Sequence, residues 1–343
     1  MDKKKYKKDF KTIKECIKTS SLPNTISLKN EYLNSIYDIK EGLTIRQKCI
    51  TGSYFYKIIK ENNESEQFSI WSKIVFGNLL PETKTSNSIT GQIYEELIIK
   101  NKYGNDLELQ KKVTDKEGYF KGDIDAYKKN KLIEIKTVSL DRLFYIEEND
   151  WKKEIFFNPF DNLPVIKKKE GKYNDLFDVK QNTKTNERKI RLLYKYEKGM
   201  KRRNINEIIE YIFTEVEEKH FYKVEKIIEN IYQVLFYLYI LEQNNEKAGA
   251  EICYIFLPKD LYINDEKNKN IYIEKFNRTF DKLRCETIHF SYEEIKDNKY
   301  LRFGECLQIA REWVEKHIRT GQSPKMTLDD KVFMEKIISE IKK

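Results

Sequence analysis

Apolar residues follow helical spacing near both ends of the chain, and strand-like alternation or short apolar runs in its middle. A spacing of three to four residues is typical of amphipathic helices, and alternation is typical of half-buried strands. The first pattern predicts helices over residues 9–18, 53–60, 68–80, 89–102, 205–218, 224–241, 273–285, 303–318 and 328–341. The second predicts strands over residues 107–113, 119–127, 131–138, 248–257 and 286–291. This order of elements indicates an α/β protein with a mixed sheet.

Turn-forming residues divide the chain into regions. The polar segment 80–88 contains a proline and several small polar residues, and it predicts a boundary. We expect a mostly helical N-terminal region (1–87), a core (88–260) and a mostly helical C-terminal region (261–343). Within the core, residues 140–204 interrupt the pattern, and we interpret them as a partly ordered insertion. We expect the strand at 248–257 to pair in parallel with the strand at 131–138.

Four charged residues stand out on the predicted hairpin. Asp123 and Asp125 are two apart on one strand, as are Glu134 and Lys136 on the next, and residues two apart share a face of a strand. If residues 129–130 form a two-residue turn, Asp125 lies directly opposite Glu134, and Asp123 lies opposite Lys136. Like charges placed opposite each other destabilise a hairpin. A cation between Asp125 and Glu134 would relieve that repulsion.

The other face of the hairpin is apolar and is predicted to pack in the core. It consists of Ile124, Ala126, Ile133 and Ile135. A polar face backed by an apolar one is consistent with a functional site on a buried sheet. The alternative is an ordinary half-exposed hairpin with Asp–Lys and Glu–Lys pairs across the strands.

Positive charge is concentrated in the predicted insertion. The 343 residues include 65 Lys and Arg against 56 Asp and Glu, a net charge of +9. Residues 167–203 hold fourteen Lys or Arg and five Asp or Glu, so this segment alone carries +9. Basic clusters bind phosphate backbones without reading sequence. The candidate DNA-binding residues are Lys167, Lys168, Lys169, Lys201, Arg202 and Arg203. The alternative is solvated surface lysine that reflects codon bias.

Five scattered cysteines form no Cys-x-x-Cys motif, which favours reduced thiols in a reducing compartment. No apolar run approaches the length that spans a membrane. We therefore expect a soluble intracellular protein, in the cytoplasm or in a viral or mobile-element context, with no membrane partner.

Two further motifs accompany the hairpin. Gln233 and Tyr237 lie four apart on a strongly apolar helix, and Gly91 is followed four residues later by Glu95. With the hairpin, this order resembles the RecB-like branch of the PD-(D/E)XK nucleases over residues 88–257. Those nucleases often carry His just before the helix Glu, where this chain has Tyr94.

The resemblance implies a restriction-endonuclease-like core, in which helices flank a mixed central sheet, with helical extensions at both ends. It implies a Mg²⁺- or Mn²⁺-dependent deoxyribonuclease, acting as an exonuclease on single-stranded DNA or duplex ends. Asp125, Glu134 and the backbone carbonyl of Ile135 would hold the metal, with Glu95 as a further ligand. Lys136 would orient or deprotonate the attacking water and stabilise phosphate charge.

The resemblance also implies that Gln233 contacts DNA and that Tyr237 braces it. CRISPR-associated RecB-like exonucleases hold an iron–sulfur cluster with one cysteine before the core and three compactly spaced cysteines after it. Cys49 suits the first position, but Cys285 and Cys306 are too far apart for the second, so we expect no cluster. The alternatives are a nucleic-acid-binding module with weak or no catalysis, a site-specific endonuclease of the same fold, and a structural assembly protein. A homo-oligomer or a partner helicase or repair complex stays open.

Overall fold

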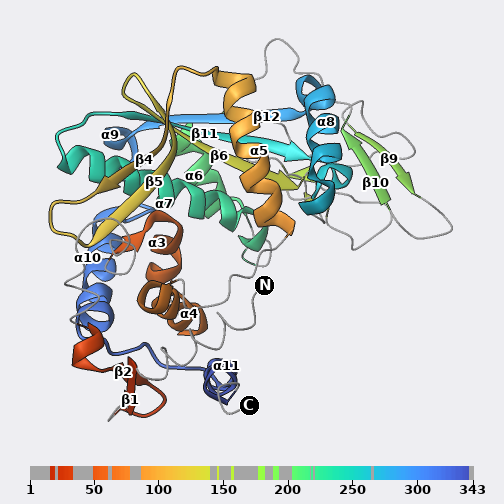
Figure 1. Ribbon diagram of the computed structural model, residues 1–343. Coiled ribbons are helices and arrows are strands. Elements are labelled where there is room, and N and C mark those ends of the chain that lie inside the picture. The colour runs from red at the N-terminus through yellow and green to blue at the C-terminus, as the bar shows by residue number, and fades with distance from the viewer. Residues whose placement is uncertain are drawn as a thin grey trace.

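A mixed β-sheet forms the centre of the protein, with helices on both faces (Figure 1). The computed structural model describes residues 16–19, 22–33, 49–60, 64–77, 86–139, 145–146, 156–157, 177–181, 188–192, 203–216, 218, 221–263 and 266–339. The strand order is β12–β11–β6–β5–β3, and β4 pairs with β5. These strands are β3 (Ile50–Thr51), β4 (Glu108–Thr114), β5 (Phe120–Lys128), β6 (Lys131–Ser139), β11 (Gly249–Leu257) and β12 (Arg284–Ser291).

The predicted parallel pairing is confirmed. Strands β6 and β11 run parallel from the pair Lys131–Gly249 to the pair Ser139–Leu257. All of β11 after Gly249 is buried, as expected for a near-continuous apolar strand covered on both faces. The sheet draws β3 from the first 87 residues and β12 from beyond residue 260, so both ends of the chain contribute to it.

Helices cover both faces of the sheet. The main helices are α3 (Gly52–Ile59), α4 (Glu64–Phe76), α5 (Ser86–Tyr103), α6 (Ile205–Thr214), α7 (Phe221–Gln243), α8 (Lys269–Thr279), α9 (Tyr292–Ile295), α10 (Phe303–Trp313) and α11 (Leu328–Ser339). A π-helical segment (Val314–Arg319) continues α10. Short 3₁₀ turns cover Lys259–Leu261, Glu266–Asn268 and Phe280–Lys282.

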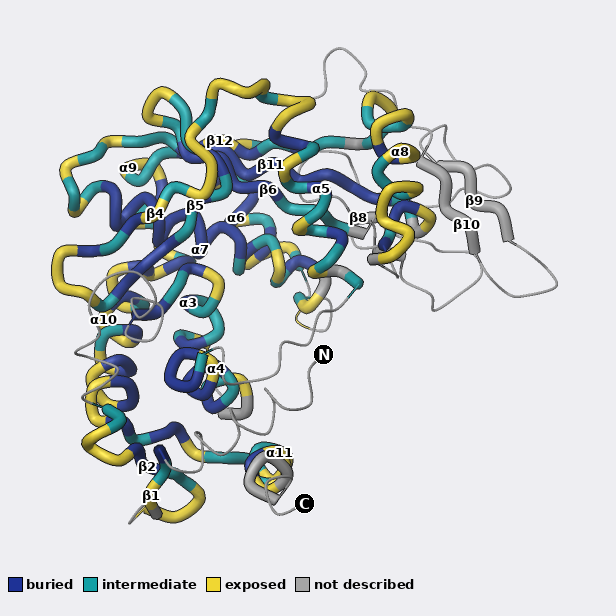
Figure 2. The backbone as a smooth tube through the Cα atoms, viewed as in Figure 1, coloured by how far each residue is buried: buried dark blue, intermediate teal, exposed yellow. Residues whose placement is uncertain are grey.

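Two hydrophobic clusters pack on opposite faces of the sheet. The larger joins α3, α4, α6, α7 and α10 to Ile252 and Tyr254 of β11. The smaller joins α5 and α8 to Cys253 and Ile255 of the same strand. Helix α7 is apolar on nearly all sides and is almost entirely buried between residues 230 and 241, as such helices are in large cores. Figure 2 shows the buried central strands between partly exposed helices.

The hairpin forms with the predicted turn but with a shorter ladder. Lys129 (φ 47°) and Asn130 (φ 60°) both have positive φ, as a two-residue type I′ turn requires. The ladder between β5 and β6 ends at the pair Ala126–Ile133. The predicted cross-strand pairs Asp125–Glu134 and Asp123–Lys136 are therefore absent from it.

The predicted single apolar face of the hairpin is wrong. Ile124 packs in the larger cluster, whereas Ala126 packs in the smaller one with Ile133 and Ile135. The alternation of side chains along β5 is therefore interrupted between Ile124 and Ala126. Asp125, the residue between them, has no ladder partner on either β4 or β6.

The helix predicted over 9–18 is also wrong where the structure describes it. Ile17–Thr19 form β1, which pairs with β2 (Ile26–Leu28), and Ser27 bridges to Gln322 near the other end of the chain. Contacts distant in sequence override the local periodicity here. Helix α5 also begins at Ser86, inside the predicted loop.

Two short ribbons occur within the predicted insertion. They are β7 (Tyr145–Ile146) with β8 (Phe156–Phe157), and β9 (Phe177–Gln181) with β10 (Arg188–Leu192). The remaining insertion residues from 140 to 202 lie outside the described part of the chain.

Candidate active site

Glu134 lies at the centre of the candidate site, on β6 beneath α7. Its side chain is 1% exposed. Its Oε1 atom accepts hydrogen bonds from Lys136 Nζ at 2.5 Å and from Gln233 Nε2 at 2.7 Å. Within the described residues, its Oε2 atom is buried without a hydrogen-bond partner. A buried carboxylate oxygen without a donor is costly, and such an atom is a candidate ligand for a cation.

Asp125 lies on β5 where the hairpin ladder ends. Its Oδ2 atom accepts the backbone N–H of Ile135 at 2.8 Å. The Asp125 side chain thus accepts a β6 amide that a backbone carbonyl of β5 would accept in a regular ladder. This contact holds Asp125 beside Glu134 and Ile135, although the predicted backbone register does not extend that far.

Helix α5 brings Glu95 to the same place. Its Oε1 atom accepts a hydrogen bond from Gln110 Nε2 at 2.8 Å. Gln110 lies on β4 with φ 51°, opposite Asp125, between the ladder pairs on either side of it. Left-handed backbone is uncommon for a residue other than glycine and marks a local irregularity. Sequence reasoning missed Gln110, because nothing in a polar residue of a strand signals its backbone angle.

Tyr94, which precedes the helix glutamate, turns away from this site. Its ring is buried against Phe276 of α8, with ring centroids 4.2 Å apart, and its hydroxyl donates to the Leu261 carbonyl at 2.8 Å. It is a core residue of the smaller cluster.

Burial raises the pKa of all three carboxyl groups, and the charge of Asp125 adds to the effect at Glu134 and Glu95. Burial, followed by the charge of Asp125, raises the pKa of Glu134 to about 8 and that of Glu95 to about 7. Burial also raises the pKa of Asp125. Full ionisation of the site near neutral pH therefore needs positive charge close by.

Lys136 supplies one such charge. Burial alone would lower the pKa of Lys136, but Glu134 and Asp125 outweigh it, so its pKa is raised. Lys136 is consequently an ammonium group at neutral pH and acts as a hydrogen-bond donor.

Gln233 and Tyr237 line the site from α7. Gln233 Nε2 donates to Tyr237 Oη at 3.0 Å as well as to Glu134. The Tyr237 ring lies against two glycines: a Cβ added at Gly52 or Gly122 would lie 2.6 or 2.4 Å from its Cε1 atom. Real Cβ atoms do not approach so closely, so glycine makes room for the ring at both positions. A DNA contact of Gln233 stays a prediction.

Asn230, one turn earlier on α7, is a second residue that sequence reasoning missed. It is 1% exposed, and its Nδ2 atom donates to Tyr254 Oη at 3.3 Å. Tyr254 pairs in register with Lys136. Within the described structure, Asn230 Oδ1 is buried without a hydrogen-bond partner. The available signal was a polar residue three positions before Gln233 on an apolar helix, but the contact with Tyr254 of another strand does not follow from it.

The donor set fits a hard divalent cation held by few protein ligands. Such cations prefer oxygen, and Mg²⁺ often keeps several waters beside one or two carboxylates. In the part of the chain that the structure describes, no three His, Cys, Asp or Glu side chains gather closely enough to hold a metal ion together. Asp125 and Glu134 are the pair best placed for such an ion.

The predicted basic residues are not brought to this site by any described contact. Lys167, Lys168, Lys169, Lys201 and Arg202 lie outside the described residues. The Arg203 guanidinium lies 3.7 Å from the ring centroid of Tyr211 on α6.

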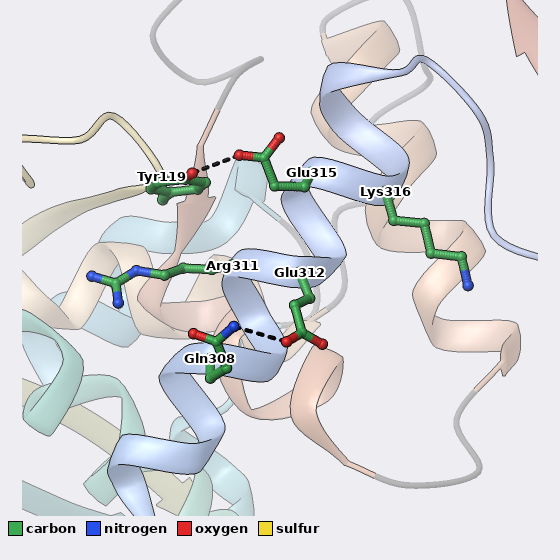
Figure 3. Close-up of a pocket in the computed structure, with 6 residues that line it drawn as sticks. All are labelled: Tyr119, Gln308, Arg311, Glu312, Glu315 and Lys316. Carbon is green, nitrogen blue, oxygen red and sulfur yellow. Dashed lines mark hydrogen bonds between the residues drawn. The ribbon is translucent and has the colours of Figure 1, made fainter.

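A separate open cavity of about 590 Å³ lies beside α10 (Figure 3). It is lined by Tyr119, Gln308, Arg311, Glu312, Glu315 and Lys316. The Tyr119 hydroxyl donates to Glu315, and Gln308 donates to Glu312. The two basic and two acidic side chains that line the cavity balance in charge. The cavity is also distinct from the carboxylate site, because Tyr119 lies just before β5 and Asp125 lies in the second half of that strand. We assign no chemistry to it.

Comparisons with known proteins add little. No protein-family model matches the chain, and no curated protein is similar to it. The crystal structure of a phage-related exonuclease from Haemophilus somnus 129PT aligns with 79% of this chain and 95% of its own, at 12% identity and a TM-score of 0.38. At that TM-score the alignment assigns neither fold nor activity to this chain. None of the described helices has the length and apolar character needed to cross a bilayer.

Proposed function

We propose that this protein is a metal-dependent deoxyribonuclease of the RecB-like PD-(D/E)XK type, built on a restriction-endonuclease-like core. The observation that carries the proposal is the buried Oε2 atom of Glu134, which has no hydrogen-bond partner among the described residues and lies beside Asp125 and the ammonium group of Lys136. A buried pair of carboxyl groups with one lysine suits the hydrolysis of a phosphodiester, because a cation bound by the pair would ionise it and neutralise negative charge on the phosphate.

In this proposal Asp125 and Glu134 would hold Mg²⁺ or Mn²⁺, with the Ile135 carbonyl as a further ligand. Glu95, the fourth ligand expected from the sequence, does not lie close enough in this structure to complete a set of three carboxylates. When bound, the ion supplies charge neutralisation at the phosphate and a more acidic water. Gln233 donates to Glu134 Oε1 and so orients the carboxylate with Oε2 left available. Tyr237 fixes Gln233 in turn.

Lys136 acts as a donor in this proposal. Because Glu134 raises its pKa, Lys136 is protonated when substrate arrives, and it contributes charge to the phosphate and a hydrogen bond to the water. We assign it these two tasks rather than removal of a proton from the water.

The proposed substrate is DNA, single-stranded or at duplex ends, cut in an exonucleolytic mode. The basic segment 167–203 would guide the strand through phosphate contacts.

The deciding experiment digests end-labelled single-stranded, linear duplex and circular duplex DNA in Mg²⁺, Mn²⁺ or EDTA. We expect metal-dependent loss of linear DNA and survival of closed circles. Activity undiminished in EDTA would refute the metal assignment, and cleavage of circles would refute the exonucleolytic mode.

A further inference from the structure

Two cysteines and a lysine meet on the face of the sheet that α5 covers. Cys253 lies on β11 and Cys285 on β12, and Lys102 lies in the last turn of α5. Cys253 pairs in register with Thr287, so Cys285 and Thr287, two apart on β12, share its face. We call Lys102, Cys253, Cys285 and Thr287 the thiol cluster.

Lys102 directs its three donors into this cluster. Its Nζ atom lies 2.9 Å from Cys285 Sγ, 3.2 Å from Cys253 Sγ and 3.0 Å from Thr287 Oγ1. A lysine ammonium has three donors and no acceptor, so these contacts account for its hydrogen-bonding capacity.

A carboxylate near Lys102 is engaged elsewhere. Glu251 Oε1 lies 4.0 Å from Lys102 Nζ. Glu251 also pairs with Lys131 and accepts a hydrogen bond from the Tyr103 hydroxyl at 2.5 Å, and His289 Nδ1 lies 3.6 Å away. Much of the positive charge of Lys102 is therefore available to stabilise a thiolate.

The two sulfur atoms, 3.5 Å apart, have different roles. The hydrogen bond with Cys253 is the largest influence on the pKa of Cys285, and with the contributions of Lys102 it outweighs burial and lowers that pKa to about 6. The same hydrogen bond and burial raise the pKa of Cys253. Geometry favours the same assignment: Lys102 Nζ lies closer to Cys285 Sγ than to Cys253 Sγ, and Cys285 is half-buried whereas Cys253 is buried. We therefore assign the thiolate to Cys285 and the donating thiol to Cys253.

The pair is poorly placed to form a disulfide. Cys253 and Cys285 are diagonal neighbours on adjacent antiparallel strands. Such neighbours have Cα atoms about 7–8 Å apart, beyond what a disulfide bridges without backbone movement. A chemical role for the cluster therefore rests on the thiolate itself.

We propose that Cys285 is a reactive thiolate at which peroxide covalently oxidises the protein, with Lys102 and Cys253 as the donors that stabilise it. Cys285 Sγ attacks one oxygen of hydrogen peroxide, the O–O bond breaks, and the products are a Cys285 sulfenic acid and hydroxide. Sulfur loses two electrons and peroxide gains them, so no further reactant is needed. Half-buried Cys285 is accessible enough to react. The proposal does not depend on the nuclease function.

Cys306 provides an internal control. It is half-buried like Cys285, but its Sγ atom contacts the Leu301 carbonyl and the Tyr232 hydroxyl, and burial raises its pKa. We would alkylate the whole protein with limiting iodoacetamide at pH 7 and follow each cysteine by peptide mass mapping. Cys285 should react about fivefold faster than Cys306, because its higher thiolate fraction outweighs the lower nucleophilicity of a low-pKa thiolate.

Variants then test the donors. Lys102→Met should slow alkylation of Cys285 several-fold and leave Cys306 unchanged, and Lys102→Arg should restore most of the rate. Hydrogen peroxide followed by dimedone should label Cys285 in the wild type and not in Cys285→Ser. Thermal melting would show that the variants are folded. Equal rates for Cys285 and Cys306, no effect of Lys102→Met in folded protein, or no dimedone adduct on Cys285 would each overturn the proposal.

Discussion

Gln233 on α7 donates its side-chain amide to Glu134 on β6 at 2.7 Å, and this contact joins the helix motif to the hairpin motif. The residues are 99 positions apart in the chain, and both are buried. The hydrogen bond occupies one oxygen of Glu134 and leaves the other without a partner among the described residues. Gln233 and Lys136, which donate to the same oxygen, together leave the other carboxylate oxygen available to a cation.

Gln233→Met should weaken the binding of Mn²⁺ by about tenfold, because partners that orient a ligand are typically worth 10- to 100-fold in metal affinity. Isothermal titration calorimetry measures the effect. Gln308→Met, on the exposed face of α10, is the matched control and should leave the affinity unchanged. Equal affinities of Gln233→Met and the wild type would show that Gln233 acts on another group, such as the substrate.

Substitutions of Asp125 and Lys136 should have different effects on metal binding. Asp125→Ala should abolish both metal binding and cleavage, because Asp125 is assigned as a ligand. Lys136→Met should lower kcat by about 100-fold or more, within the range for a positioned donor, and retain metal affinity. Calorimetry and single-turnover cleavage separate the two. Loss of metal binding in Lys136→Met as severe as in Asp125→Ala would contradict the role of Lys136.

The raised pKa values of Glu134 and Glu95 predict a dependence of stability on pH. The folded protein keeps protons on these groups up to about pH 8 and pH 7, whereas the unfolded chain releases them near the ordinary value of 4.5. Between these values the folded state binds more protons, so the free energy of unfolding decreases as pH rises. Without divalent ions, the melting temperature should therefore fall from pH 5 to pH 8.

Glu134→Gln tests the origin of this dependence. Without the Glu134 carboxyl, the melting temperature should fall less between pH 5 and pH 8. The variant should therefore gain stability relative to the wild type as pH rises. Added Mn²⁺ should raise the melting temperature of the wild type at pH 8 by mass action, and that of Glu134→Gln much less. Parallel pH profiles of the two proteins would place the titration elsewhere.

The close contact of Gly122 with Tyr237 predicts a specific cost. A Cβ in Gly122→Ala would lie 2.4 Å from Tyr237 Cε1, so the ring must move. Overpacking of this kind costs about 1–3 kcal/mol of unfolding free energy. Displacement of Tyr237 should also loosen Gln233 and lower activity.

Gly304→Ala, on α10, is the control for Gly122→Ala. A Cβ there meets no other atom within 4 Å, and alanine in a helix should be neutral or stabilise by up to about 1 kcal/mol. Urea unfolding measures both variants. Equal stabilities would mean that Tyr237 has space to adjust.

The sequence allowed the main elements around the site to be predicted because their signals are local. The turn at Lys129–Asn130 and the helix carrying Gln233 follow from polar and apolar patterns, and the parallel partner of β6 follows from a continuous apolar strand. The contact of Asp125 with the Ile135 amide was not predictable in this way. It depends on where two strands separate, which the packing of both sheet faces determines.

Gln110 and Asn230 were missed for related reasons. The backbone angle of Gln110 arises from an irregular pairing with β5, and a single polar residue in a strand gives no sign of it. Asn230 becomes notable only because Tyr254 of another strand lies beside it. Both side chains belong to the site through contacts between elements, which a pattern along one element does not reveal.

The basic segment should control affinity rather than chemistry. Its net charge of +9 over residues 167–203 can neutralise several phosphates, and each contact adds about 0.7 to the salt slope of single-stranded DNA binding. We would replace six residues by Gln: Lys167, Lys168, Lys169, Lys201, Arg202 and Arg203. DNA binding should weaken and the slope of log affinity against log salt should flatten, similarly for unrelated DNA sequences, because phosphate contacts carry no base information directly.

Fluorescence anisotropy at several salt concentrations measures this slope, and cleavage at saturating DNA should change little. Lys269→Gln with Lys282→Gln, both exposed around α8, is the control for a general loss of surface charge and should leave the slope nearly unchanged. An equal slope in the six-residue variant and the wild type would mean that the basic segment is solvated surface. DNA would then approach the carboxylate site along another face. The next residues to replace would be half-buried Lys57 and exposed Lys226, which pair with Glu66 and Glu229 and whose charges act on each other near Lys136.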